Sequence, residues 1–173
     1  MNSKVITESG MSFGPFPDGD CFYIEKSKTY AKIQPNVKMA EFLVLRPGPA
    51  KTNVWIIEAK SSSPKPEPQT NFEKFIAEIQ EKLVNAFGLS MALHLNRHIS
   101  AYNELPQRFK QLDLAETDYK FVLVINGHKD EWLVPLKDAL LNALRAMINV
   151  WALGPLPVAV LNDIEARKIG LIT

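Results

Sequence analysis

The sequence predicts a protein on the border between the α/β and α+β classes, with helices packed against a mixed sheet. Two short apolar runs, 54–60 and 120–126, are typical of strands that are covered on both faces. Two longer segments, 70–95 and 131–150, place apolar residues at helical spacing. A helix between the two strands allows a parallel crossover. We therefore expect a three-layer sandwich with a mixed central sheet and helices on both faces.

The N-terminal part of the chain gives a weaker pattern. Residues 1–20 are predicted to be an irregular segment, since 10–20 are rich in Gly, Pro and Asp. Residues 21–33 combine helical spacing with Tyr and Ile, and we interpret them as a strand or hairpin. The run "VKMAEFLVL", 37–45, predicts another strand, and a turn-rich connection at 46–53 joins it to the next one.

The boundaries of the later elements have their own signals. The segment "SSSPKPEPQT", 61–70, contains three prolines and predicts an exposed, extended loop. Thr70 and Glu73 have the spacing of a capping box, which predicts the start of the long helix. A final strand is expected at 157–161, and Asn162 or Asp163 is expected to cap a short C-terminal helix.

Length, charge and cysteine content narrow the class of protein. A chain of 173 residues fits one domain, 1–173, with a sizeable core. The net charge of +1 means that a nucleic-acid surface has to be a local patch. The single cysteine, Cys21, excludes a framework of internal disulfides and fits a cytoplasmic location. The N-terminus lacks a signal-peptide pattern, and no apolar run is long enough for a membrane span.

The strand "VWIIEAK" ends in charged residues, which are costly at a buried strand end unless they are compensated. Alternation places Glu58 and Lys60 on one face of this strand. If Leu45 lies opposite Val54 in an antiparallel hairpin, Glu41 falls opposite Glu58, with Cβ atoms about 5 Å apart. A divalent cation between two such carboxylates removes their repulsion, and oxygen ligands suit Mg²⁺ or Mn²⁺.

This arrangement resembles the PD-(D/E)XK nuclease superfamily, which has the restriction-endonuclease-like fold. The matching residues are Glu41 in "KMAEFLVL" and Glu58 with Lys60 in "WIIEAK", and the resemblance covers 37–126. It implies that Glu41, Glu58 and the backbone carbonyl of Ala59 hold the metal, and that Lys60 assists the attacking water. The chain departs from the family pattern at Glu41, where Asp is usual, and at Ala40, where Pro often stands.

Further residues of the site are expected from the same resemblance. An acidic ligand from an upstream element is common in that family, and Glu25 is the candidate here. The helix after the E-x-K strand often contributes, which points to Gln80 and Lys82. Lysines that could track a phosphate backbone are Lys26, Lys28, Lys32, Lys51 and Lys65. The alternative for these lysines is a solvated surface balanced by the 19 acidic residues.

Two functions follow as hypotheses. The first is a Mg²⁺- or Mn²⁺-dependent phosphodiesterase that acts on DNA or RNA with in-line attack by water. The second is a catalytically silent nuclease-like module that binds a protein or nucleic-acid partner. Because no separate recognition domain is visible, a specific nuclease would need a partner protein or a homodimer for targeting. A minor alternative is a zinc site at His94 and His98, which share a face if the helix continues past 95.

Overall fold

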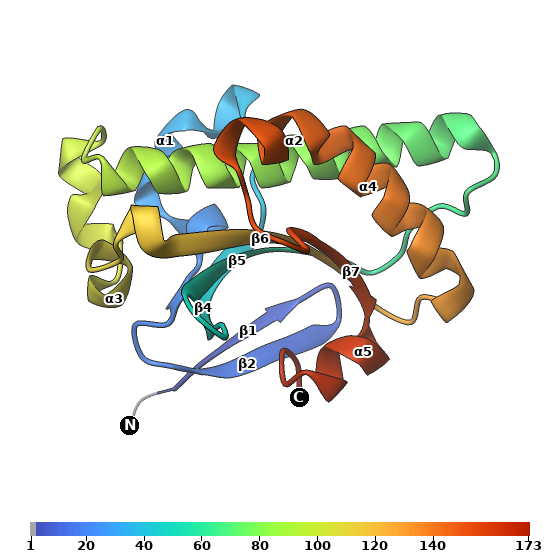
Figure 1. The fold of residues 1–173 in the computed structure, drawn as a ribbon, viewed down its shortest axis with the longest axis horizontal. Helices are drawn as coiled ribbons and strands as arrows, with labels where there is room; N and C mark the ends of the chain where they lie inside the picture. The colour runs from blue at the N-terminus through green and yellow to red at the C-terminus, as the bar shows by residue number, and fades with distance from the viewer. Residues whose placement is uncertain (1–2) are drawn as a thin grey trace.

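The computed structural model describes residues 3–173, apart from the side chains of 100–102, and it confirms the predicted α/β class. Its centre is a five-stranded mixed sheet in the order β3-β4-β5-β6-β7 (Figure 1). β4 pairs antiparallel with both β3 and β5, and β5, β6 and β7 are parallel to one another. The strands are β3 (Cys21–Phe22), β4 (Phe42–Pro47), β5 (Thr52–Lys60), β6 (Thr117–Ile125) and β7 (Val158–Asn162).

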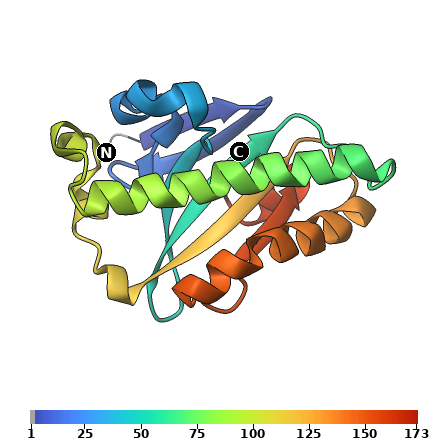
Figure 2. The same ribbon diagram turned by 90° about the horizontal axis from the view of Figure 1, so that it is seen from above.

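One face of the sheet is covered by two long helices, as Figures 1 and 2 show. They are α2 (Gln69–His94) and α4 (Asp130–Trp151), and both agree closely with the helices predicted from apolar spacing. Their buried residues, such as Leu83 and Leu140, form one core with Ile56 of β5. The predicted capping box is wrong, because α2 begins at Gln69 after Pro68 and has no side-chain cap.

The other face is covered mainly by a hairpin, which corrects one prediction. Residues 1–20 were expected to be irregular, but β1 (Ser3–Glu8) and β2 (Met11–Pro17) form an antiparallel pair. The helix on this face is the short α5 (Asp163–Lys168), which lies beside the hairpin (Figure 1). The hairpin forms because Ser9 and Gly10, with φ of 52° and 76°, make the tight two-residue turn that a twisted strand pair favours.

The segment 21–33 is helical for most of its length, so the predicted strand or hairpin is wrong beyond Phe22. After η1 (Ile24–Lys26), α1 (Lys28–Ile33) begins at Ser27, whose hydroxyl accepts from the Tyr30 N–H at 3.0 Å. The Glu104 carboxylate also accepts from the N–H groups of Lys28 and Thr29, at 2.6 and 3.0 Å. This cap comes from 75 residues downstream, so local propensity could not reveal it.

The remaining elements connect the layers. The strand expected at 37–45 starts later, at Phe42, because η2 (Gln34–Asn36) and an irregular stretch precede it. The connector before β6 contains η3 (Ile99–Glu104), α3 (Gln107–Lys110) and η4 (Leu114–Glu116). Asn162 caps α5 as predicted, accepting from the Glu165 N–H at 2.9 Å. Within 3–173, no helix is long and apolar enough to cross a bilayer.

The hairpin of β4 and β5 has the register that was predicted from the sequence. Leu45 lies opposite Val54, and the pairing continues to Phe42 opposite Ile57. Val54 and Ile56 belong to the core under α2, whereas Ile57 and Ala59 belong to the core under the β1-β2 hairpin. The face that alternation assigns to Glu58 is therefore the face that α2 covers.

Candidate active site

Two buried glutamates lie where β4 begins and β5 ends. Glu58 has no exposed surface, and Glu41 is 7% exposed. The Glu41 N–H donates to the Ile57 carbonyl at 3.0 Å, which fixes Glu41 beside the end of β5. One carboxylate oxygen of each residue, Oε2, is buried and has no hydrogen-bond partner. Buried carboxylate oxygens are normally satisfied, so these two atoms call for a ligand or a proton.

Glu41 belongs to a group of three carboxylates, Glu8, Glu25 and Glu41, which we call the acidic cluster. One carboxylate oxygen from each residue lies within 4.8 Å of the other two. Glu8 ends β1, and Glu25 lies in η1, where its N–H donates to the Glu41 carbonyl at 3.2 Å. The Tyr23 hydroxyl donates to Glu8 Oε1. Three chain segments therefore direct carboxylates to one point.

The turn of the β1-β2 hairpin holds Glu8 in this cluster. The Ser9 hydroxyl donates to the Ala59 carbonyl at 3.0 Å, and the Asn126 amide donates to the Ser9 carbonyl at 3.1 Å. The turn is thus attached to the ends of β5 and β6. The Ala59 carbonyl, which the family resemblance implies as a metal ligand, already accepts this hydrogen bond from Ser9. Its role as a ligand stays a prediction.

The environment of Glu41 opposes its ionisation. Burial raises the pKa of Glu41 to about 9, and the hydrogen bond with Glu25 acts in the same direction. The negative charges of Glu58, Glu25 and Glu8 raise it further. Clustered carboxylates of this kind either keep protons or share a cation.

Glu58 lies beside two lysines instead, and we call Glu58, Lys60, Glu78 and Lys82 the lysine group. Glu58 Oε1 lies 2.8 Å from Lys82 Nζ and 3.3 Å from Lys60 Nζ. Lys60 Nζ also donates to Glu78 Oε1 at 3.0 Å. Burial raises the pKa of Glu58, while Lys82 and then Lys60 act against that shift. The hydrogen bond from Lys60 lowers the pKa of Glu78.

The structure tests which predicted residues meet at this point. The acidic cluster contains the predicted Glu41 and the upstream Glu25. The lysine group contains the predicted Glu58, Lys60 and Lys82. Gln80 belongs to neither, because its amide donates to the Ala143 carbonyl of α4 at 2.7 Å. Glu8 and Glu78 were missed. Glu78 stands four residues before Lys82 on α2, a spacing that brings both to one helical face, so its position could have been found from the sequence.

The lysines expected to contact nucleic acid lie in different places. Lys26 is close to the site, with Nζ 3.5 Å from Glu25 Oε2, whereas Lys28 and Lys32 lie on α1. Lys65 follows β5 and packs over the Trp132 ring. Lys51 lies away from the glutamates, because it precedes β5 and pairs with Glu116 at 3.7 Å. At about 3.3 Å per strand residue, it is roughly 20 Å from Glu58.

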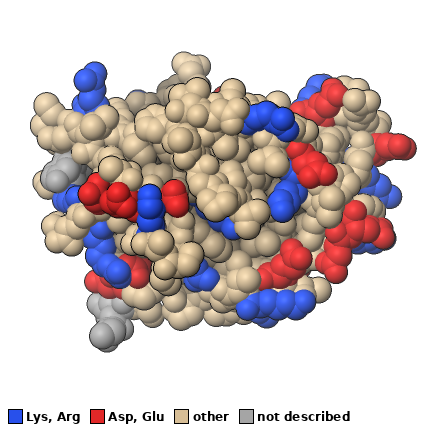
Figure 3. All heavy atoms as spheres, viewed as in Figure 1, with Lys and Arg blue, Asp and Glu red and all other residues tan. Residues whose placement is uncertain are grey.

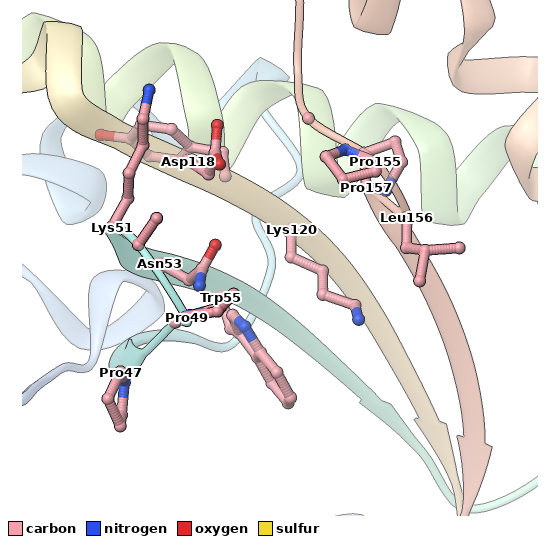
Figure 4. A pocket seen from close by; sticks show the side chains of 14 residues that line it. Pro47, Pro49, Lys51, Asn53, Trp55, Asp118, Lys120, Pro155, Leu156 and Pro157 are labelled. Atoms are coloured by element: carbon pink, nitrogen blue, oxygen red, sulfur yellow. The ribbon is translucent and has the colours of Figure 1, made fainter.

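On the face shown in Figure 3, acidic and basic side chains are interspersed, and no large patch of one charge covers it. This agrees with the net charge of +1. A cavity of about 470 Å³ lies near Lys51, at the opposite end of the sheet from the glutamates. In Figure 4, Trp55 and Lys120 project into it from neighbouring strands. Because of its distance from the glutamates, we treat this cavity as separate from the candidate site.

The alternative zinc site at His94 and His98 is wrong. α2 ends at His94, and the chain turns at Leu95, so the two histidines do not share a helical face. The acidic cluster is the only group of three or more His, Cys, Asp or Glu side chains with converging ligand atoms among the described residues.

Comparisons of the chain with protein-family models, with curated proteins and with solved structures gave no match. The argument for function therefore rests on the site itself. Its donor set consists of carboxylate oxygens, which suit Mg²⁺ or Mn²⁺ better than softer metals. The unpartnered buried oxygens of Glu41 and Glu58 fit the same requirement.

Proposed function

We propose that this protein is a divalent-metal-dependent phosphodiesterase that acts on DNA or RNA. The observation that supports it most strongly is the pair of buried carboxylates, Glu41 and Glu58, each with an unpartnered oxygen, beside Lys60. Glu8 and Glu25 extend the pair into a set of converging carboxylates. A structural ion pair alone would not need carboxylates from three separate segments in one place.

In this proposal, Glu41 and Glu58 hold Mg²⁺ or Mn²⁺, with Glu8 and Glu25 as further ligands. The cation supplies an acidified water and neutralises charge on the phosphate. Lys60, whose side chain is 24% exposed, is placed to stabilise the negative charge that develops on the phosphate. Glu78 holds the Lys60 ammonium in position at 3.0 Å, and Lys82 of α2 holds Glu58 through its Oε1 atom at 2.8 Å. A second copy or a partner protein would supply sequence recognition.

The test is a cleavage assay on single-stranded DNA, double-stranded DNA and RNA, with Mn²⁺, with Mg²⁺ and with EDTA. We expect metal-dependent cleavage that is lost in Glu41→Gln. Lys60→Ala should keep metal binding but cut more slowly, by about 100-fold, the scale of one preorganised electrostatic contact. Lys51→Ala is the matched lysine control and should cut at the normal rate, because Lys51 is at the opposite end of β5.

Absence of cleavage on all three substrates would contradict the enzyme proposal. If the protein then still binds Mn²⁺ or an oligonucleotide, the silent binding module becomes the better account. The engagement of Glu58 by two lysines favours this alternative, since Lys60 and Lys82 occupy one of its two carboxylate oxygens, Oε1.

A further inference from the structure

A second group of side chains, Lys65, His128, Lys129 and Trp132, lies at the same edge of the sheet as the acidic cluster. We call it the Trp132 patch. The ammonium nitrogens of Lys65 and Lys129 lie 5.5 and 4.9 Å from the centre of the Trp132 ring. The His128 ring centre lies 5.3 Å from the same point. Three side chains from two loops therefore surround the indole of Trp132, which lies at the start of α4.

Hydrogen bonds attach this patch to the strand end that carries Glu58 and Lys60. The Asn126 N–H donates to the Lys60 carbonyl at 2.9 Å. The Asn162 amide donates to the His128 carbonyl at 3.0 Å. Lys60 is the register partner of Ile125, and neighbouring strands are about 4.8 Å apart. The loop with His128 and Lys129 thus follows β6, the strand next to the one that ends in the proposed catalytic Lys60. Lys65 lies in the loop that follows Lys60.

The charges of the patch are available to a ligand. Lys65 and Lys129 are exposed, and neither ammonium has a carboxylate partner within the described part of the chain. Two nearby acidic groups have hydrogen-bond donors of their own: Asp130 accepts from the Asn162 amide, and Asp163 accepts from the Gly127 N–H. His128 is 8% exposed, and its Nε2 atom has no hydrogen-bond partner.

We propose that the Trp132 patch binds single-stranded nucleic acid beside the bond to be cut, an inference that rests on the proposed function. One base stacks on Trp132, and the phosphates on either side of it contact Lys65 and Lys129. An aromatic ring with cations around it is the usual platform for single strands. A duplex does not offer this contact, because its bases are already stacked on one another.

Trp55 provides an internal comparison. Arg46 and Lys120 flank its ring at 5.2 and 5.1 Å, so its immediate surroundings are similar. Arg46, however, donates to the Ile169 carbonyl at 2.5 Å, so part of its hydrogen-bonding capacity is used within the protein. Trp55 also lies on the sheet face opposite to Glu58. A strand held there would not be directed to the acidic cluster.

The experiment measures binding of fluorescent oligo-dT and oligo-U, and of a DNA duplex, in EDTA, so that no cleavage is needed. Trp132→Ala should weaken single-strand binding by about 10-fold, the scale of one lost base stack. The double variant Lys65→Gln/Lys129→Gln should reduce the slope of log affinity against log salt by about 1.4, for two lost phosphate contacts. Trp151→Ala, at the other end of α4 and 51% exposed, is the matched control and should bind normally.

The proposal is overturned if wild-type protein binds neither single strand. It is also overturned if both patch variants bind as wild type does, or if the duplex binds more tightly than the single strands. If Trp132→Ala unfolds, the exposed lysine variant decides the question. Binding at the patch without any cleavage would contradict the proposed enzyme function and leave this inference standing.

Discussion

Two neighbouring glutamates of this protein have opposite surroundings. Glu41 lies among Glu8, Glu25 and Glu58, and burial with these charges raises its pKa to about 9. Glu58 is more deeply buried, but Lys82 and Lys60 lie within 3.3 Å of its Oε1 atom. The lysine group is therefore compensated within the chain. Among the described residues the acidic cluster is paired only with the exposed Lys26, 3.5 Å from Glu25, so its buried member Glu41 needs a proton or a cation from solution.

The largest effect on stability should come from the lysine group. Glu58→Ala removes the carboxylate that holds Lys82, whose side chain is only 15% exposed. Breaking one side of such a buried pair costs about 3 kcal/mol, so the free energy of unfolding in urea should fall by that amount in EDTA. The double variant Glu58→Ala/Lys82→Met should recover much of the loss. Equal or higher stability in Glu58→Ala would show that repulsion with Glu41 dominates instead.

Removing a carboxylate from the acidic cluster should change stability in the opposite direction. In EDTA at pH 8, Glu41→Gln should raise the free energy of unfolding by about 1 kcal/mol. Gln does not ionise, so the variant avoids the cost of burying a carboxyl that would be charged in the unfolded chain. The folded-state pKa of Glu41 is raised from 4.5 to about 9. Wild type therefore loses stability as pH rises through this range, and the advantage of the variant should vanish below about pH 4.5.

Thermal melts of wild type and Glu41→Gln at pH 4.5 and pH 8 measure this difference. Excess Mn²⁺ should stabilise wild type and leave the variant unchanged, since a ligand stabilises only the state that binds it. A variant that is less stable than wild type at pH 8 in EDTA would mean that Glu41 already has a favourable partner.

The smallest effect should come from Gly88, on the helix that carries Glu78 and Lys82. A Cβ atom at Gly88 would meet no other atom within 4 Å, and its φ is not positive. Gly88→Ala should therefore raise the free energy of unfolding by about 0.8 kcal/mol through helix propensity alone. Gly127→Ala, also in open space but at φ of +63°, is the control and should be destabilising. A change in Mn²⁺ binding by Gly88→Ala would show that helix stability and the site are linked.

The sequence allowed the lysine-bearing strand and its register to be predicted, and this has a physical reason. The strands "VKMAEFLVL" and "VWIIEAK" are apolar and joined by one turn, so burial permits few registers. Leu45 opposite Val54 was found, and Glu41 directly precedes the last pair, with its N–H bonded to the Ile57 carbonyl beside Glu58. The sequence alone treated these two glutamates as an equivalent repelling pair. Their difference depends on Lys82, which reaches Glu58 from another element.

The parts that were not predicted depend on contacts between distant segments. Glu8 reaches the cluster because Ser9 is hydrogen-bonded to Ala59, 50 residues away. The Ser-Gly dipeptide at 9–10 is a recognisable turn sequence and could have predicted the hairpin. The cap that Glu104 supplies to α1 has no local signal, whereas Ser27, which also caps α1, was visible in the sequence.

The central claim is that the acidic cluster binds a divalent cation. Titration calorimetry with Mn²⁺ on wild type, Glu41→Gln and Lys60→Ala at one pH tests it most directly. We expect saturable Mn²⁺ binding by wild type and by Lys60→Ala, and none by Glu41→Gln, because Glu41, unlike Lys60, supplies a ligand atom to the cluster. Absence of Mn²⁺ binding in wild type, or binding that is unchanged in Glu41→Gln, would contradict the account.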